Sequence, residues 1–272
     1  MARTGETILD EIIAARRRRL TIARQRMPLI MLKKVLETKR AARDFAAAIS
    51  GPGIHVIPEM KQASPSRGVL RQNYQPRELA KGYEGAGASA LSVLTEEDYF
   101  HGSLSDLKAA REATRLPVLR KDFIIAPYQV YESAAAGADA VLLIVAALSD
   151  EDLRELVELA EILDVAALVE VHTEDELDRA LSAGARVIGV NNRNLRTLEV
   201  NLETSFHLRA KMPADCIAVT ESGIKAPEDL RRLADAGFSA ALIGESLLVA
   251  DDPGRELARL LAGARSPAAR GA

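Results

Sequence analysis

The stretch Ala136-Gly137-Ala138-Asp139-Ala140 links the end of a helical pattern to an apolar run, and similar stretches recur along the chain. They are Ala86-Gly87-Ala88-Ser89-Ala90, Ala183-Gly184-Ala185-Arg186-Val187 and Ala236-Gly237-Phe238-Ser239-Ala240. Glycine directly after a helix is typical of a left-handed C-cap, because only glycine takes a positive φ without a Cβ clash. The four glycines lie 50, 47 and 53 residues apart, so each interval has room for two strand–helix units of about 25 residues. The repeat therefore predicts alternating strands and helices in a parallel architecture.

Short β-branched or leucine-rich runs mark the candidate strands, several of which are apolar at consecutive positions, as strands covered on both faces should be. They are His55–Met60, Ala90–Leu94, Val118–Arg120, Ala140–Ile144, Ala167–Glu170, Val187–Val190, Ile217–Thr220 and Ala241–Ile243. Helical patterns follow them, among them Tyr128–Ala136, Asp150–Leu163 and Pro227–Ala236. Eight units in roughly 210 residues favour a closed (β/α)8 TIM barrel over a doubly wound sheet of five or six strands. We predict an α/β protein with a single domain, in which an N-terminal helical extension (1–48) precedes a barrel (49–272).

The composition limits the class of protein further. Of 272 residues, 48% are hydrophobic and 28% charged, which is typical of a globular protein in water. The longest strongly apolar run, Ala140–Leu148, has nine residues, against the roughly 18–20 that cross a bilayer. Residues 1–6 lead into a polar stretch without the apolar core of a signal peptide, and Cys216, the only cysteine, cannot form an intramolecular disulfide. We expect no membrane span and a cytoplasmic location.

Positive charge is concentrated near the N-terminus. Residues 1–43 carry 12 Lys/Arg and 4 Asp/Glu, although the whole chain has a net charge of −3. The run Arg16-Arg17-Arg18-Arg19 could form a nucleic-acid-binding arm or the solvated face of a helix. The solvated face is favoured, because no aromatic residues for base stacking are interleaved and an apolar stripe is available for burial. The stripe comprises Ile8, Leu9, Ile12, Ile13, Leu20 and Ile22. No nucleic-acid partner is predicted.

Charged residues stand where the predicted strands end, which in a barrel is the mouth of the active site. A period of two directs both Glu59 and Lys61 inward, although such a pair could merely close the barrel. For Lys121, desolvation and a neighbouring cation would lower the pKa toward that of a general acid or an amine nucleophile; a solvated loop lysine is the alternative. Burial in an apolar run would raise the pKa of Glu170. His172, two positions farther on, is expected at the surface.

Glycines directly after the seventh and eighth strands, in Ser222-Gly223 and Gly244-Glu245-Ser246, are placed to aim backbone N–H groups at a phosphate. Either pair alone could be a plain turn. The loop Ser64-Pro65-Ser66-Arg67-Gly68 adds hydroxyls and a guanidinium, so a phosphorylated small molecule is the expected substrate. Neither a metal nor a nucleotide cofactor is predicted. The four histidines lie on different elements, and the chain has neither a Gly-x-Gly-x-x-Gly turn nor a Gly-Lys-Ser/Thr loop.

Taken in order, these motifs resemble the indole-3-glycerol-phosphate synthase family from about residue 8 to residue 250. The motifs are Pro58–Gly68, Ser92–Glu96, Tyr99–Gly102, Arg120–Phe123, Leu143–Ile144, Val169–Val171, Gly189–Arg193, Glu221–Gly223 and Ile243–Ser246. Other phosphosugar barrels share mainly the phosphate glycines. The resemblance implies a carbon–carbon lyase (carboxy-lyase) of tryptophan biosynthesis that needs no cofactor. Its reaction closes 1-(2-carboxyphenylamino)-1-deoxyribulose 5-phosphate to indole-3-glycerol phosphate, with loss of CO2 and water.

The resemblance also implies roles for particular residues. Lys121 resembles the principal general acid, Glu170 its partner in proton transfer during dehydration, and Lys61 the lysine that pairs with the substrate carboxylate and can also donate a proton. Which lysine protonates in which step is open at this point. The positions that orient these groups and the substrate hydroxyls are matched by Glu59, Asn191 and Ser222. The family's N-terminal extension covers the barrel mouth.

The resemblance places the phosphate at a cradle that would consist of Ser64, Gly223, Gly244 and Glu245, with Arg193 adding charge. A carboxylate at Glu245 would repel phosphate unless its side chain turns away and only its backbone N–H is used. Phe100 and Phe123 could wall the anthranilate ring or simply pack in the core.

Two other functions are open on the residues alone. Paired lysines could make Lys61 or Lys121 the Schiff-base nucleophile of a phosphosugar lyase or aldolase, which borohydride trapping would detect. A non-catalytic phosphate-binding barrel would bind ligand without forming product.

A monomer is expected, because the sequence has no obvious exposed apolar repeat.

Overall fold

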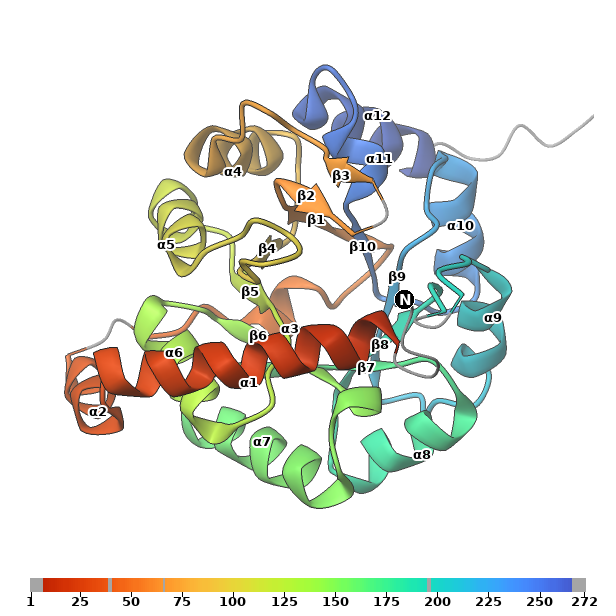
Figure 1. The fold of residues 1–272 in the computed structure, drawn as a ribbon. Helices are drawn as coiled ribbons and strands as arrows, with labels where there is room; N and C mark the ends of the chain where they lie inside the picture. Colours follow the sequence, from red (N-terminus) through yellow and green to blue (C-terminus); the bar gives the residue numbers. More distant parts are fainter. Residues whose placement is uncertain (1–6, 39–40, 66, 195–196, 266–272) are drawn as a thin grey trace, which may run out of the picture.

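A computed structural model of the chain describes residues 7–38, 41–65, 67–194 and 197–265. Within these ranges parallel strands close into a barrel with the order β1-β10-β9-β8-β7-β6-β5-β4 (Figure 1). The strands are β1 (His55–Met60), β4 (Leu91–Leu94), β5 (Val118–Lys121), β6 (Ala140–Ile144), β7 (Ala166–Val171), β8 (Val187–Asn191), β9 (Ile217–Glu221) and β10 (Ala240–Ile243). The predicted (β/α)8 TIM barrel is confirmed, and each strand ends within one residue of its predicted boundary.

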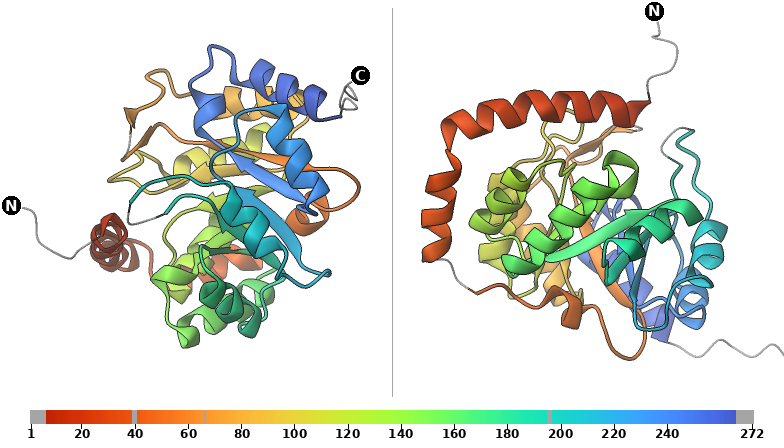
Figure 2. Two further views of the ribbon diagram at one scale, coloured as in Figure 1. Left: turned by 90° about the vertical axis from the view of Figure 1, so that its right-hand side faces the viewer. Right: turned by 90° about the horizontal axis from the view of Figure 1, so that it is seen from below.

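Helices form a ring around the barrel (Figures 1 and 2). They are α4 (Pro76–Gly85), α5 (Leu104–Ala113), α6 (Pro127–Ala136), α7 (Asp150–Ile162), α8 (Glu174–Ser182), α9 (Glu203–Arg209), α10 (Pro227–Asp235) and α12 (Pro253–Arg265). The repeated glycines have the predicted positive φ, between 84° and 93°, at Gly87, Gly137, Gly184 and Gly237. No described helix is both long and apolar enough to cross a membrane.

Several short elements were not predicted from sequence. They are the hairpin of β2 (Ala63–Ser64) and β3 (Gly68–Val69), the 3-10 turn η1 (Val145–Ala147) and the helix α11 (Glu245–Leu248). All of them lie in loops that follow strands. Such elements are too short to show a hydrophobic period.

The barrel interior is filled from its amino-terminal end. Ile57, Leu119 and Leu142 belong to a buried cluster that also contains Phe45 and Ile49 of the short helix α3 (Phe45–Ala48) and the residue after it. A second cluster fills the space between the strands and the outer helices. Because α3 closes one end with apolar side chains, polar chemistry is left to the opposite end, where the strands finish.

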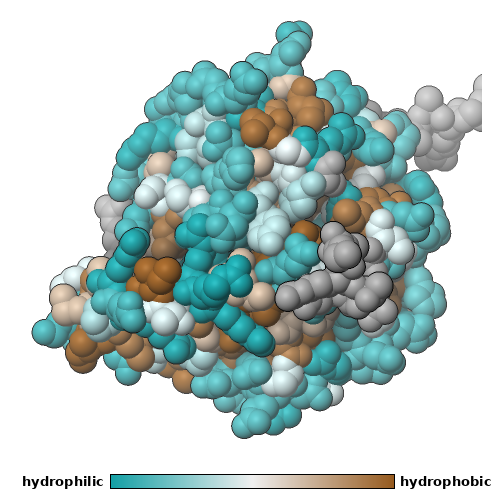
Figure 3. Space-filling view, viewed as in Figure 1, coloured by the Kyte–Doolittle hydropathy of each residue, from teal (hydrophilic) through white to brown (hydrophobic). Residues whose placement is uncertain are grey.

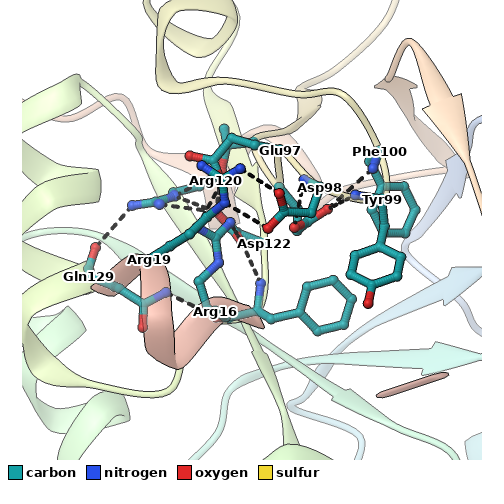
Figure 4. Close-up of polar contacts among 12 residues, drawn as sticks. Arg16, Arg19, Glu97, Asp98, Tyr99, Phe100, Arg120, Asp122 and Gln129 are labelled. Carbon is teal, nitrogen blue, oxygen red and sulfur yellow. Dashed lines mark hydrogen bonds and ion pairs between the residues drawn. The ribbon is translucent and has the colours of Figure 1, made fainter. Parts of the chain in front are cut away.

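The helix α1 (Ile8–Arg26) lies across the carboxyl ends of the strands, and α2 (Leu29–Glu37) turns down along the outside (Figures 1 and 2). The prediction of a solvated arginine face is wrong for Arg16, which is only 5% exposed. Its guanidinium pairs with Asp122 at 2.5 Å and Glu97 at 3.0 Å (Figure 4). Ile22, expected in the buried stripe, is 48% exposed instead. Leu9 and Ile12 of the predicted stripe are buried as expected, and carboxylates on the barrel loops add Arg16 to the same face.

Replacing Arg16 by alanine should lower the free energy of unfolding, because it removes one partner of the buried Asp122 carboxylate. Arg120 also contacts Asp122, at 3.0 Å, so this carboxylate keeps one cationic partner. We therefore expect the free energy of unfolding to fall by about 3 kcal/mol, the lower end of the range for breaking a buried ion pair. Denaturation with guanidinium chloride measures the change. The neighbouring Arg17 is exposed, so Arg17→Ala is the matched control and should stay within about 0.5 kcal/mol of the parent. Equal effects of the two variants would contradict a buried anchor at Arg16.

Candidate active site

A cavity of about 1000 Å³ opens at the carboxyl ends of the strands. Of the predicted site residues it is lined by Glu59, Lys61, Phe100, Lys121, Phe123, Glu170, Asn191, Arg193, Ser222, Gly223, Gly244 and Glu245. These residues come from most of the strands and the loops after them. The topology thus brings together side chains that are far apart in the sequence.

One predicted residue, Ser64, does not line this cavity. It is buried in β2, where it pairs with Gly68 across the hairpin, whereas the nearby Arg67 does reach the cavity. Ser66, from the same predicted loop, lies outside the described residues. The hairpin places the loop's guanidinium, rather than the hydroxyl of Ser64, against the cavity.

Lys121 at the end of β5 sits between two carboxylates from β7 and β9. Its Nζ lies 3.0 Å from Oε2 of Glu170 and 3.3 Å from Oε2 of Glu221. Burial lowers the pKa of Lys121, but Glu170, Glu221 and Glu59 outweigh burial and hold it above its ordinary value. The predicted lowering is therefore wrong, because carboxylates, and not a second cation, surround this amine. The predicted pair of Lys61 with Glu59 is present at the end of β1.

The two carboxylates that contact Lys121 differ in protonation. Burial raises the pKa of Glu170, but the cations of Lys121 and His172 outweigh it and place the pKa below its ordinary value. This corrects the predicted upward shift. For Glu221, burial dominates over Lys121, and with the added repulsion from Glu170 and Glu59 it raises the pKa to about 7. One carboxylate is thus firmly ionised, while its neighbour exchanges a proton near neutral pH.

Glu221 was not among the predicted site residues. Its signal in the sequence is the same as that of Glu170, a carboxylate that ends an apolar strand, here Ile217–Glu221. Only the fold shows that β9 faces β5 across the mouth, which brings this carboxylate to Lys121. Oε1 of Glu221 is buried and has no hydrogen-bond partner among the described residues.

Two glycines leave room for these carboxylates. A Cβ at Gly189 would lie 2.5 Å from Oε1 of Glu221, and a Cβ at Gly244 would lie 2.5 Å from Oε1 of Glu59. Neither glycine needs a positive φ. Their role is therefore space, since any larger residue would displace a site carboxylate.

A hydrogen-bond network orders the loops after β8 and β9. Oδ1 of Asn191 accepts from Ser222 Oγ at 2.9 Å and from the backbone N–H of Arg193 at 3.0 Å. Ser222 has a positive φ of 67° and Gly223 one of 89°. A left-handed conformation at serine carries strain, which is expected where a backbone is shaped for function.

The loops after β1, β8 and β10 bring two guanidinium groups and one carboxylate together at the cavity. Arg67 Nη2 lies 2.9 Å from Oε1 of Glu245, and Arg193 Nη2 lies 3.9 Å from its Oε2. The Glu245 side chain therefore turns toward the two arginines. The rings of Phe100 and Phe123 lie 6.2 Å apart and form an apolar wall.

Among the described residues, no group of three or more His, Cys, Asp or Glu is placed to hold a metal ion.

A closed (β/α)8 barrel with ion-paired lysines and glutamates at the carboxyl ends of its strands defines a barrel enzyme. A family model described as indole-3-glycerol phosphate synthase matches residues 9–260. The chain belongs to the indole-3-glycerol phosphate synthase family.

Individual relatives agree with this assignment. A protein of Polaromonas naphthalenivorans named indole-3-glycerol phosphate synthase is 50% identical over 257 residues, covering 93% of this chain and 98% of that protein. One of the same name from Chloroherpeton thalassium is 52% identical over 250 residues, covering 90% and 96%. The solved structure of thiamine phosphate pyrophosphorylase from Pyrococcus furiosus matches with a TM-score of 0.60 at 16% identity, over 77% of this chain and 95% of that one. That likeness concerns the fold alone.

Proposed function

We propose that the protein is a carboxy-lyase of tryptophan biosynthesis that converts 1-(2-carboxyphenylamino)-1-deoxyribulose 5-phosphate to indole-3-glycerol phosphate. The observation that carries the proposal is the position of Lys121 Nζ, 3.0 Å from Glu170 and 3.3 Å from Glu221 in the cavity, where the two carboxylates favour its protonated form. An amine kept protonated suits a proton donor, whereas a Schiff-base nucleophile must be neutral. This disfavours the lyase or aldolase alternative.

In the proposed reaction, Lys121 donates a proton to the ketose carbonyl oxygen while the ring carbon that bears the carboxylate attacks the carbonyl carbon. Loss of CO2 then returns its bonding electrons to the aromatic ring. The new hydroxyl takes a second proton from Lys61, which the loss of CO2 has freed, and leaves as water. Glu170 removes a proton from the methylene carbon next to the nitrogen, and the electrons of that C–H bond form the new double bond of the indole. Lys61, paired with Glu59, attracts the substrate carboxylate, and Asn191 with Ser222 orients the hydroxyls.

The phosphate is proposed to bind at the other side of the cavity, against the backbone of Gly223 and Gly244 and the guanidinium groups of Arg67 and Arg193. The anthranilate ring would then lie along Phe100 and Phe123. In this arrangement the phosphate competes with Glu245 for the two arginines, since that carboxylate already contacts both.

Mixing the purified protein with the proposed substrate, without metal or nucleotide, tests the function. A rise in indole fluorescence is expected, and the chain contains no tryptophan that would obscure it. No rise from a folded protein that still binds the substrate would overturn the proposal. Borohydride trapping of a ketose phosphate on a lysine would then identify a lyase of the Schiff-base type.

Replacing Glu245 by glutamine should lower KM, because it removes the carboxylate that competes with the phosphate. A like-charge contact near water is worth about 1 kcal/mol, so we expect KM to fall about 5-fold and kcat to change little. Inhibition by inorganic phosphate should strengthen in parallel. Glu228→Gln is the control, because Glu228 pairs with Arg231 on the exposed surface of α10. A higher KM in Glu245→Gln would mean that Glu245 instead helps to hold the arginines in place.

We further infer that residues 1–48 act as an extension that covers the mouth of the barrel (49–272) within one domain. Tyr128 on α6 donates from its hydroxyl to the carbonyl oxygens of Ala23 and Met27, at 3.0 and 2.8 Å, which adds to the anchor at Arg16. Residues 1–6, 39–40 and 266–272 lie outside the described part of the chain. Substrate should slow amide hydrogen exchange in α1 if the extension covers the site. Unchanged exchange would speak against it.

We also infer that the protein works as a monomer in the cytosol. A single barrel supplies all the proposed catalytic residues, so the site is complete without a second copy. The thiol of Cys216 suits a reducing compartment. The face in Figure 3 is largely hydrophilic, but apolar side chains gather on α2, where Ile30 is 62% exposed. Sedimentation equilibrium should give the monomer mass of 29.4 kDa. A dimer would contradict the inference and indicate α2 as the surface to test.

A further inference from the structure

His172 lies directly behind the proposed active site, although the sequence suggested a surface position. It follows β7, two residues after Glu170, and its side chain is only 11% exposed. It does not line the cavity. Its Nε2 lies 3.4 Å from Oε1 of Glu170. The prediction of a surface histidine is therefore wrong, because the chain turns the ring back against the carboxylate.

The other ring nitrogen is held by the first turn of α8. Nδ1 of His172 lies 3.1 Å from Oε2 of Glu176, and the same oxygen accepts the backbone N–H of His172 at 2.7 Å. A carboxylate that binds both the ring and the backbone fixes the orientation of the imidazole. Glu176, His172 and Glu170 thus form a continuous chain that leads from α8 to the site.

The two oxygens of Glu170 have different cationic neighbours. Oε2 accepts from Lys121 at 3.0 Å, while Oε1 faces the imidazole of His172. Nε2 of His172 is buried and makes no hydrogen bond with any described residue. Its position 3.4 Å from Oε1 places the charge of the protonated ring beside Glu170 as well as beside Glu176.

The charged groups around the imidazole are carboxylates on three elements, Glu170 on β7, Glu176 on α8 and Glu221 on β9. Burial lowers the pKa of His172, but the hydrogen bond to Glu176 and the charges of Glu170 and Glu221 outweigh burial and raise it above its ordinary value. The imidazolium form therefore persists to higher pH than in a free histidine.

We propose that His172 is a positioning residue, whose imidazolium holds Glu170 ionised and turned toward Lys121 for proton transfer. This inference rests on the proposed function, since it needs Glu170 to exchange a proton with the substrate. His172 itself does not touch the substrate, because it stands outside the cavity. Its effect on the reaction is electrostatic and acts through Glu170.

The proposal predicts the direction in which the contribution of His172 to kcat changes with pH. Below the raised pKa of His172 the ring is charged and Glu170 is supported, and as pH rises through that pKa the support is lost. The ratio of kcat in the parent protein to kcat in His172→Gln should therefore be large at low pH and approach one at high pH.

His172→Gln is the primary variant, because glutamine places a polar N–H group of similar reach beside Glu170 but is neutral at every pH. We expect kcat to fall about 10-fold at pH 6, near the lower end of what losing an orienting partner causes, with KM unchanged. The matched control is His207→Gln. His207 also pairs with a glutamate, Glu174 at 2.5 Å, but on the exposed surface of α9, and this variant should show the parent kcat at every pH.

Glu176→Gln provides a second variant that keeps the imidazole in place. It removes one of the carboxylates that raise the pKa of His172, so the pH at which the kcat ratio changes should move to lower values. NMR titration of the four histidine rings, with His172 assigned from the missing signal in His172→Gln, should show the same shift without any activity measurement.

The outcomes separate this inference from the proposed function. An active parent protein whose kcat ratio to His172→Gln is independent of pH would overturn the positioning role and leave the function intact. A lower stability of His172→Gln with an unchanged pH profile would likewise reduce His172 to a packing residue. A parent protein that forms no indole product would overturn the proposed function itself.

Discussion

Replacement of Lys121 by alanine is expected to lower kcat by at least about 10²-fold, the lower end of a general-acid contribution. Lys121 is the cation that both Glu170 and Glu221 contact, because its Nζ lies between their carboxylates. Without it, the ammonium group that both carboxylates hold in the cavity, and that we propose as the proton donor, is lost. Stopped-flow or steady-state measurement of indole fluorescence gives kcat directly.

The variant also leaves Glu221 without its cationic partner and Glu170 with His172 in place of two cations, which is expected to destabilise the protein. Activity should therefore be measured at pH 6, where a carboxylate with the raised pKa of Glu221, about 7, is mostly protonated. Circular dichroism at the same pH establishes that the variant is folded. The control is Lys211→Ala, because Lys211 also pairs with a glutamate, Glu174, but at the surface. A folded Lys121→Ala protein with the parent turnover would refute the assignment.

Replacement of Glu170 by glutamine should also lower kcat by about 10²-fold, as expected for loss of a general base. The lowered pKa of Glu170 keeps it ionised across the neutral range, and glutamine cannot accept the proton at any pH. The loss should therefore persist from pH 6 to pH 8. The kcat profile of the variant against the parent measures this.

The neighbouring carboxylate supplies the matched comparison. Glu221→Gln imitates the protonated form of Glu221, so its effect should be small below about pH 7 and increase above it. This contrast follows from protonation alone, because both carboxylates contact the same Nζ. Equal pH-independent losses in the two variants would contradict the different protonation states that burial and the cations impose.

The barrel could be predicted because its signals are local and repeated. Glycine after every second helix, as at Gly137, and apolar runs such as Ala140–Ile144 depend on neighbours within a few residues. Each strand in a parallel barrel is covered on both sides, so its apolar run is nearly continuous. The hairpin at Ala63–Ser64 and the helix at Glu245–Leu248 escaped prediction because elements this short depend on the loops packed against them.

The site residues could be predicted in part, because the barrel topology alone places strand ends at one mouth. That rule and the motif resemblance together indicated Lys121 and Glu170, which the fold does bring together. Their pKa directions were predicted wrongly. A shift depends on which charges lie within a few ångströms, and the neighbours of Lys121 come from strands about 50 and 100 residues away.

The amino-acid sequence by itself determined the alternation of strands and helices, the closure into a barrel and the set of polar residues at the mouth, because periodicity and glycine geometry act locally. Only the tertiary structure decided the pairing of Arg16 with Asp122, the contact of His172 with Glu170 and the third carboxylate at Glu221. Those contacts join residues that the fold brings close together in space. Coulomb interactions in a buried site depend on that distance and on the surrounding dielectric, and neither can be read from position along the chain.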